Sequence, residues 1–320
     1  MKRLLFATLG VALCASMIQS SGALAADYPK KPVVMTITFK PGGASDIAGR
    51  LSAKAAEKLL GQSIRAQNKL GGGGSIGFDF VGKQKPDGYN IGWLSASILT
   101  TTLLGKLPYG YEQFDYVCAV TFDATTIAVR ADSPYKTLPE FLNAAKKNPG
   151  KIKIGHAGSG SFTYMTAAAL VSKQNTKVTF VPVGKRRLPS LLAGEVDAIS
   201  VHPPELIPSM RAGKVRLLAI SSPKRVAAYP DVPTFEEIGM DLGFYQFRGI
   251  FVPKGTPHAI KAKIANAFKA AATDKTLADM AKKRGFGVNY IGLDKFPDYV
   301  KKQNALLASV VAKIKKAKKK

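Results

Sequence analysis

The sequence is poor in the residues that build metal sites and disulfides. Its 320 residues include two cysteines, Cys14 and Cys118, and three histidines, His156, His202 and His258. A single cysteine after the N-terminal segment makes no internal disulfide and no cysteine metal cluster, and no H-E-x-x-H motif is present. We therefore expect no metal and no cofactor, and we predict that Cys118 is a small buried residue.

Acidic residues are also scarce. The chain has 21 Asp and Glu against 47 Lys and Arg, which gives a formal net charge of +26 at pH 7. Such an excess is first of all typical of a solvated lysine-rich surface, and a general attraction for anions is the next interpretation. Nucleic-acid binding requires more than charge, and the lysine-rich C-terminal run is predicted to be a solvated helix end. We expect no nucleic-acid partner.

Long apolar runs are missing except near the N-terminus, in MKRLLFATLGVALCASMIQSSGALAAD. Two early basic residues, an apolar stretch from Leu4 to about Met17 and the small-residue site at residues 23–26 are typical of a secretory signal peptide. We predict that residues 1–26 are this signal, cleaved near Ala26. Because no later run is long and apolar enough to span a membrane, we expect an exported protein that is not membrane-embedded.

Strand-like and helix-like segments alternate along the rest of the chain. Residues 33–39 form a β-rich run, and residues 46–60 place apolar side chains at four-residue spacing on one helix face. Further strands are predicted at residues 63–67, 90–95, 151–155, 178–183, 196–201 and 215–220, and further helices at 76–83, 163–173, 188–192, 258–273, 275–283 and 293–316. This alternation predicts an α/β fold with mainly parallel sheets. The strands are too many for one small sheet, so we expect two lobes, 27–125 plus 247–320 and 126–246.

Two glycine motifs have the spacing of nucleotide-binding loops but lack the residues that such loops need. Residues 72–77 match G-x-G-x-x-G, yet no acidic residue follows about twenty positions later. Residues 77–83 match the P-loop spacing, but Gln84 stands where a magnesium-binding Ser or Thr belongs. We interpret both matches as chance.

Two small-residue turns, KPGGASD at 40–46 and HAGSGSFT at 156–163, each follow a strand and precede a helix. A helix N-terminus has free amide donors and positive potential, so it binds an anion without a catalytic residue. Ser45 is the predicted N-cap, and Asp46 falls in the first helical turn, where the helix dipole favours its charge. Ligands of open α/β sheets bind beyond the carboxyl ends of strands, so one turn from each lobe predicts an anion site in a cleft. The alternative is that the glycines only make turns.

A secreted hydrolase is another open alternative. Ser159 and Ser161 lie in glycine-rich sequence but do not form the G-x-S-x-G motif, because Ala157 stands two residues before Ser159. The sequence alone leaves open a pairing of one of these serines with His156 or His202.

The order of several segments resembles the Bug family, the periplasmic substrate-binding components of tripartite tricarboxylate transporters. The resemblance runs from Tyr28 to about Leu293 and rests on YPKKPV, FKPGGASDIAGRLSAK, LGQSIRAQNKLGGGGSIGFDFVGKQKPDGYNI, IGHAGSGSFTYMTAAAL, LLAGEVDAI, GKVRLLAISSPKRVAAYPDVPTFEEIG and GIFVPKGTP. It implies a two-lobed periplasmic binding protein fold, type II-like, that closes about a hinge.

The resemblance also implies a function. A non-enzymatic, monomeric periplasmic protein would capture a small organic carboxylate, a dicarboxylate or an aromatic acid, between its lobes. It would deliver this ligand to the membrane components of the transporter. The alternative within the same class of fold is a ligand-binding partner of a sensor system.

The candidate ligand-binding residues follow from the two turns and from the resemblance. In the first lobe they are Phe39, Lys40, Gly42, Gly43, Ser45 and Asp46, and in the second lobe His156, Ala157, Gly158, Ser159, Ser161 and Thr163. Asp46 is expected to order its turn, because direct contact with an anion would be repulsive. Four residues are candidates for the distal end of the ligand: Lys40, Arg186, Phe247 and Arg248. The run Lys185-Arg186-Arg187 is interpreted either as a solvated loop or as a cationic contact for a second carboxylate.

Overall fold

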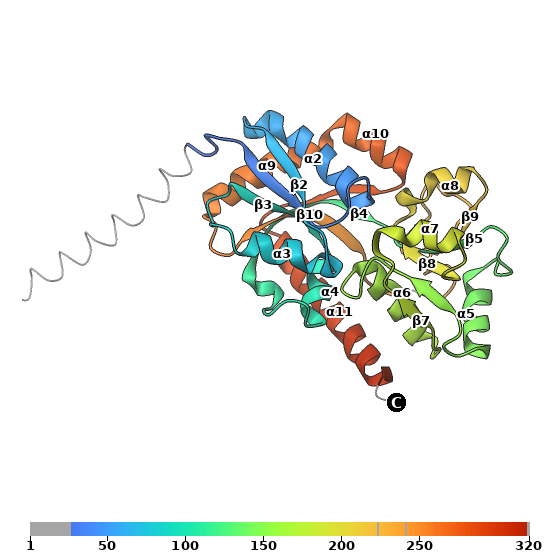
Figure 1. Ribbon diagram of the computed structural model, residues 1–320. Coiled ribbons are helices and arrows are strands. Elements are labelled where there is room, and N and C mark those ends of the chain that lie inside the picture. Colours follow the sequence, from blue (N-terminus) through green and yellow to red (C-terminus); the bar gives the residue numbers. More distant parts are fainter. Residues whose placement is uncertain (1–26, 223, 241, 319–320) are drawn as a thin grey trace, which may run out of the picture.

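Two β-sheets flanked by helices organise the chain in a computed structural model of the protein (Figure 1). The structure describes residues 27–222, 224–240 and 242–318. The predicted signal peptide, residues 1–26, lies outside the described residues. Each sheet forms the centre of one lobe, and Figure 1 shows the two lobes side by side.

The first lobe contains a six-stranded sheet with the strand order β11-β4-β10-β3-β1-β2. In that order its strands are Gly287–Ile291, Phe114–Asp123, Gln246–Pro253, Asn90–Ser95, Val33–Ile37 and Ile64–Asn68. Strand β1 runs parallel to β2 and β3, whereas β10 runs antiparallel to β3 and β4, and β11 antiparallel to β4.

The second lobe contains a five-stranded sheet with the order β7-β6-β8-β5-β9. In that order its strands are Thr179–Val181, Lys153–Gly155, Ala198–Val201, Thr126–Arg130 and Val215–Ile220. Strand β6 is parallel to β7 and β8, and β5 is antiparallel to β8 and β9.

The two-lobed α/β prediction is confirmed, but both sheets are mixed, so the expectation of mainly parallel sheets is wrong in that detail. Strand β4 ends at Asp123 and β5 begins at Thr126 in the other sheet, while β10 begins at Gln246 on the return to the first. These strands connect the lobes instead of closing β-α-β units, so the parallel rule for such units does not apply to them.

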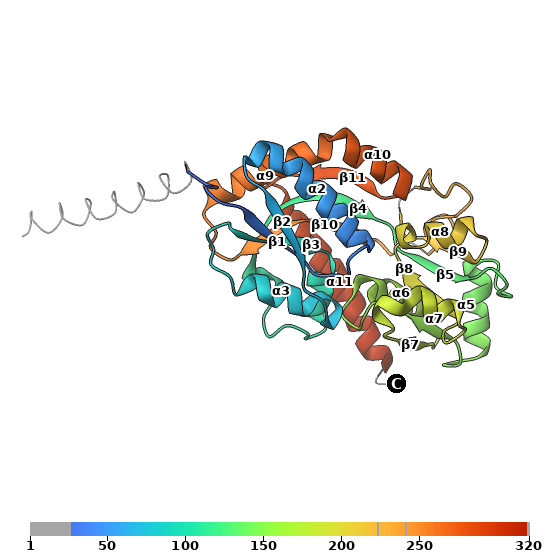
Figure 2. The same ribbon diagram turned by 45° about the horizontal axis from the view of Figure 1, so that its top comes forward.

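Helices cover both faces of the first sheet (Figures 1 and 2). One face carries α2 (Ala44–Leu60), α9 (His258–Thr273) and α10 (Lys275–Arg284), and the other α3 (Ser75–Gly82), α4 (Ser97–Leu103) and α11 (Phe296–Lys318). The second sheet is flanked by α5 (Leu138–Lys147), α6 (Phe162–Lys173), α7 (Arg187–Leu192) and α8 (Ile207–Arg211). Short 3₁₀ turns occur at Gly72–Gly74, Tyr111–Gln113, Gly184–Arg186 and Pro203–Glu205.

A shared hydrophobic core joins the two lobes. The buried cluster around α4 and α11 also contains Phe162 and Met165 from α6 of the second lobe. In the same cluster, Phe162 packs edge-to-face on Phe244, just before the chain returns to the first lobe, with ring centroids 5.5 Å apart. Burial of one such side chain contributes about 1.5–3 kcal/mol. The lobes are therefore held together behind the cleft by side-chain packing as well as by the connecting strands.

Cys118 is a free cysteine on β4 and is fully buried, as predicted. Burial raises the pKa of its thiol well above the ordinary value. Within the described ranges, none of the helices combines the length and the apolar character that crossing a membrane requires.

Candidate functional site: a cleft between the lobes

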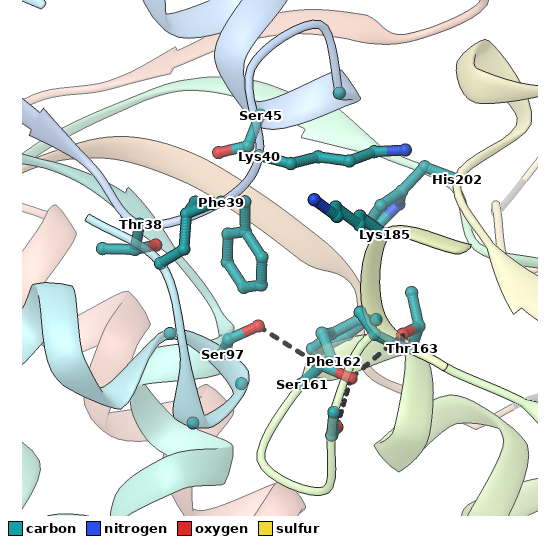
Figure 3. Close-up of a pocket in the computed structure, with 18 of the residues that line it drawn as sticks. Thr38, Phe39, Lys40, Ser45, Ser97, Ser161, Phe162, Thr163, Lys185 and His202 are labelled. Carbon is teal, nitrogen blue, oxygen red and sulfur yellow. Dashed lines mark hydrogen bonds between the residues drawn. The ribbon is translucent and has the colours of Figure 1, made fainter. Parts of the chain in front are cut away.

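A cavity of about 450 Å³ lies between the lobes, within the size range of ligand pockets (Figure 3). Both predicted turns line it. From the first lobe it is lined by Thr38, Phe39, Lys40, Gly43, Ala44, Ser45, Leu70, Gly71, Gly72, Gly73, Gly74, Ser97, Lys106, Gln246 and Arg248, and from the second by Ala157, Gly158, Ser159, Ser161, Phe162, Thr163, Pro182, Gly184, Lys185, Arg187, His202 and Glu205.

The first turn, residues 40–46, exposes the N-terminus of α2 to the cavity. The N-cap is Gly43, with extended backbone and no side-chain cap, so the predicted cap at Ser45 is wrong. The chain becomes helical two residues earlier than predicted, because the Ile47 amide donates to the Gly43 carbonyl at 3.0 Å. The Ser45 hydroxyl is buried and has no hydrogen-bond partner among the described residues. Together with the first amides of α2, which a helix leaves unpaired, it forms a group of donors at the cavity wall.

Asp46 holds the first turn in place from the side that does not line the cavity. Its carboxylate accepts hydrogen bonds from the Gly42 amide at 3.0 Å, from Arg50 Nε at 2.9 Å and from Asn68 Nδ2 at 2.9 Å. Neither Gly42 nor Asp46 lines the cavity. The charge of Asp46 is thus turned away from the ligand space and is used to hold the loop in shape.

The second turn, residues 156–163, is closed on itself. Ser161 caps α6: its Oγ accepts from the Tyr164 amide at 3.2 Å and donates to the Gly158 carbonyl at 2.7 Å. Because that bond uses the Ser161 proton, Thr163 donates in the 3.0 Å contact between the two hydroxyls. Thr163 Oγ1 in turn accepts from the Ala157 amide at 3.3 Å. Both hydroxyl protons are therefore used within the turn.

A glycine seam, which we define as Gly72–Gly74 of the first lobe and Gly158–Gly160 of the second, brings the lobes into contact. A Cβ placed on Gly73, at a φ of +73°, would lie 2.7 Å from backbone atoms of Gly160 and Ser161. Only glycine permits this approach. The predicted site does not contain Gly72–Gly74, although the glycine run was visible in the sequence. Its spacing was interpreted as a chance nucleotide motif.

Two hydrogen bonds cross between the lobes beside the seam. The Phe162 amide donates to Ser97 Oγ at 3.0 Å, as Figure 3 shows, and Thr100 Oγ1 donates to the Gly160 carbonyl. With the seam, they make the second turn part of the contact surface between the lobes.

The two buried histidines are neutral groups. Burial lowers the pKa of His156 to about 4, and its Nδ1 accepts from the Gly158 amide at 3.1 Å. Burial, followed by the nearby Arg248 charge, lowers the pKa of His202 to about 4. His202 lines the cavity and its Nδ1 lies 2.9 Å from the Ala124 carbonyl, whereas His156 does not line it. Among the described residues, the hydrogen bonds of Ser159 and Ser161 include none to either histidine, so the geometry provides no hydrolase pair.

Most charged side chains at the cavity are paired. Glu205 accepts from Arg187 at 2.7 Å and lies 3.3 Å from Lys40 Nζ, so one carboxylate serves cations of both lobes. Burial opposes the charge on Glu205, but the positive charges of Arg187 and Lys40 hold its pKa below the usual value. Arg248 is paired with Asp123, and both side chains are almost fully buried.

Two predicted distal residues lie outside the cavity. Arg186 is exposed and pairs with Glu195 at 2.7 Å. Phe247 is buried in the core against Phe296, at a centroid distance of 5.8 Å. Successive side chains of a strand point to opposite faces, so Arg248 enters the cavity and Phe247 does not.

The remaining predicted residues line the cavity: Phe39, Lys40, Gly43, Ser45, Ala157, Gly158, Ser159, Ser161, Thr163 and Arg248. Sequence reasoning missed Thr38, Ser97, Lys106, Gln246 and His202 as cavity residues. It noted Lys185 and Arg187 only as part of a basic run. Thr38 directly follows strand β1, and Gln246 is the first residue of strand β10. No local sequence signal marked either residue, since only the packing of the two lobes brings them to the same cavity.

Two mixed α/β lobes joined by crossing strands around a polar cleft define the class of periplasmic binding proteins. A family model described as "tripartite tricarboxylate transporter family receptor" matches residues 48–315. The chain belongs to this family, which includes the Bug proteins, so the predicted family membership is confirmed.

Known members of the family resemble the chain over nearly its whole length. A UPF0065 protein of Cupriavidus necator is 30% identical over 308 residues, which cover 94% of this chain and 92% of the relative. The solved structure of the periplasmic binding protein BugD has a TM-score of 0.82 and 29% identity, covering 90% of this chain and 98% of that one. MatC of Rhodopseudomonas palustris, solved with bound malate, has a TM-score of 0.81 and 27% identity, covering 89% and 100%.

Proposed function

We propose that this protein captures a small organic carboxylate, a dicarboxylate or an aromatic acid, in the cleft and delivers it to the membrane components of a tripartite tricarboxylate transporter. One observation carries the proposal. Five buried polar atoms of the cavity residues have no hydrogen-bond partner within the described ranges: Thr38 Oγ1, Ser45 Oγ, Arg187 Nε, Gln246 Oε1 and Arg248 Nη1. Buried polar groups are normally hydrogen-bonded, so a polar ligand, with its waters, is the natural partner of these atoms.

The arrangement favours an anion. The N-terminus of α2 and the Ser45 hydroxyl supply neutral donors in positive potential, which suits one carboxylate group. Five cations line the same cavity against the single lining carboxylate of Glu205: Lys40, Lys106, Lys185, Arg187 and Arg248. The relative MatC, whose structure contains malate, supports the carboxylate assignment.

Ligand binding is coupled to the meeting of the lobes in this proposal. The glycine seam and the Ser97–Phe162 hydrogen bond form only when the second turn lies against the first lobe. A ligand that contacts both lobes stabilises that arrangement and is shielded from water until it is released. Export to the periplasm, a monomeric state and delivery to a membrane partner belong to the same proposal.

A thermal-shift screen of the chain from residue 27 onward tests the ligand class. The panel contains aliphatic monocarboxylates, dicarboxylates and aromatic carboxylates, with neutral sugars and amines as controls. A ligand of the folded state stabilises it by about 2.7 kcal/mol at a hundred times its Kd. We expect at least one carboxylate to raise the Tm and the neutral compounds to leave it unchanged. A shift with sugars or amines and none with any carboxylate would contradict the proposal.

A further inference from the structure

Three consecutive basic residues before and within α7 have three different surroundings. Lys185 lines the cavity, and Figure 3 shows its side chain extending toward Lys40 and Phe39. Arg186 is exposed and paired with Glu195. Arg187 is buried, bonded to Glu205 and to the Gly184 carbonyl, both at 2.7 Å. Successive residues of a helical turn point in directions about 100° apart, so neighbours in sequence face different surroundings.

Lys185 is a cavity cation that no acidic side chain of the described residues neutralises. Lys40 and Arg187 share the carboxylate of Glu205, and Arg248 is paired with Asp123. In the described part of the chain, Lys185 has no ion pair and its ammonium has no hydrogen bond. Lys106, the other unpaired cavity lysine, lies beside Gly160 of the second turn, 3.6 Å from the position of an added Cβ.

Two unpartnered arginine atoms accompany Lys185. Arg187 Nε and Arg248 Nη1 are buried, have no partner among the described residues and belong to side chains that line the cavity. A free ammonium in the same cavity as unused guanidinium donors is an arrangement that can bind a second acidic group. Gln246 Oε1, also unpartnered, adds an acceptor for a ligand hydroxyl or a bridging water.

We infer that Lys185 is a specificity-determining residue that binds a second acidic group of the ligand, so that the ligand is a small aliphatic dianion and not an aromatic monoacid. The inference rests on the proposed function, because it takes the first carboxylate to lie at the N-terminus of α2. The dianion then bridges the lobes: its first group contacts α2 of the first lobe and its second contacts Lys185 of the second. The negative charge of the second group therefore increases the affinity for the ligand and also stabilises the contact between the two lobes.

The test is isothermal titration calorimetry with malate and succinate, each compared with its own monoamide. The amide has nearly the shape of the acid but one negative charge fewer. We expect wild type to bind the diacid at least about tenfold more tightly than the monoamide. Lys185→Met should weaken diacid binding about tenfold and leave monoamide binding unchanged. The matched control is Arg186→Met, which removes the same charge one residue away, outside the cavity, and should change neither affinity.

The outcomes separate this inference from the proposed function. Equal losses in Lys185→Met and Arg186→Met would mean a general charge effect and would overturn the inference, as would equal losses for diacid and monoamide. If wild type binds monoacids or monoamides as tightly as diacids, the inference fails and the proposed function stands. If no carboxylate binds at all, both fail. Lys185 is exposed, so an unchanged Tm without ligand shows that the variant is folded.

Discussion

The two turns that meet at the cleft look alike in sequence but are built differently. The first turn has an N-cap without a side-chain bond, and its Ser45 hydroxyl has no partner in the described structure. The second turn caps its helix with Ser161, whose proton goes to the Gly158 carbonyl. The first turn thus leaves its donors without a protein partner among the described residues, while the second uses the Ser161 and Thr163 hydroxyls to hold a fixed shape against the first lobe. Similar composition does not imply the same role.

The second turn should be sensitive to acid, whereas the first contains no histidine. His156 has a folded pKa of about 4 against an ordinary value of 6.5, because burial disfavours its charged form. Its contribution is fully present above pH 6.5 and is lost as the pH falls toward 4, on the order of 3 kcal/mol in unfolding free energy. Urea unfolding from pH 8 to 4 measures this loss.

The matched variant for the pH experiment is His156→Asn, which keeps an acceptor for the Gly158 amide but does not titrate. We expect its stability to fall less steeply than that of wild type between pH 6.5 and 4. His202, with a pKa also near 4, supplies the slope that persists in both proteins. Identical slopes in the two proteins would show that His156 is not held neutral by the fold.

The glycine seam between the lobes should tolerate no side chain at Gly73. Gly73→Ala places a methyl group 2.7 Å from the backbone of Gly160 and Ser161, so the two lobes must move apart at this point. Overpacking of this kind costs about 1–3 kcal/mol, which corresponds to roughly 5- to 150-fold weaker ligand binding. The control Gly61→Ala has a similar φ of +75° with nothing within 4 Å, so it measures backbone strain alone. Equal ligand affinities in the two variants would mean that the seam does not contribute to binding.

Ser161→Ala should affect stability more than affinity. The variant loses the cap of α6 and the bond to the Gly158 carbonyl, at a cost of about 1 kcal/mol. Thermal unfolding without ligand measures that cost, and calorimetry should show little change in ligand affinity. A large loss of affinity with unchanged stability would mean that the Ser161 hydroxyl serves the ligand directly.

Ser45→Ala should show the reverse behaviour. The Ser45 hydroxyl makes no hydrogen bond to the described protein, so its removal should leave the Tm without ligand nearly unchanged. Loss of one donor to a carboxylate weakens binding by about 1.5 kcal/mol, roughly tenfold. If Ser45→Ala destabilises the protein and binds ligand normally, the contrast between the two turns is incorrect.

Regular elements of the fold could be predicted well from local pattern. Strand β9 at Val215–Ile220 and helix α9 at His258–Thr273 have the expected bounds, because their apolar spacing is regular. The antiparallel strands β4, β5 and β10 were not among the predicted elements. Their pairing depends on how the chain passes between the lobes, which is a long-range property that no local pattern encodes.

The site could be predicted in outline but not in detail. Both turns were predicted from their glycines and from the strand–turn–helix order, and both line the cavity. Arg186 was predicted to contact the ligand, but in the structure Lys185 lines the cavity and Arg186 pairs with Glu195. Which of these two neighbours faces the cavity depends on how a short helical turn is rotated about its axis. The cap at Gly43 instead of Ser45 depends on a shift of the helix start. A sequence pattern does not locate a helix start or the direction of a side chain to within one or two residues.

The most direct test of a carboxylate receptor is titration of the protein from residue 27 onward with malate and, separately, with the uncharged dimethyl ester of malate. The ester keeps the carbon skeleton and the hydroxyl but removes both charges. The account predicts one binding site per chain for malate and no measurable binding of the ester. Equal binding of the two compounds, or binding of the ester alone, would contradict the claim that this cleft selects its ligand by negative charge.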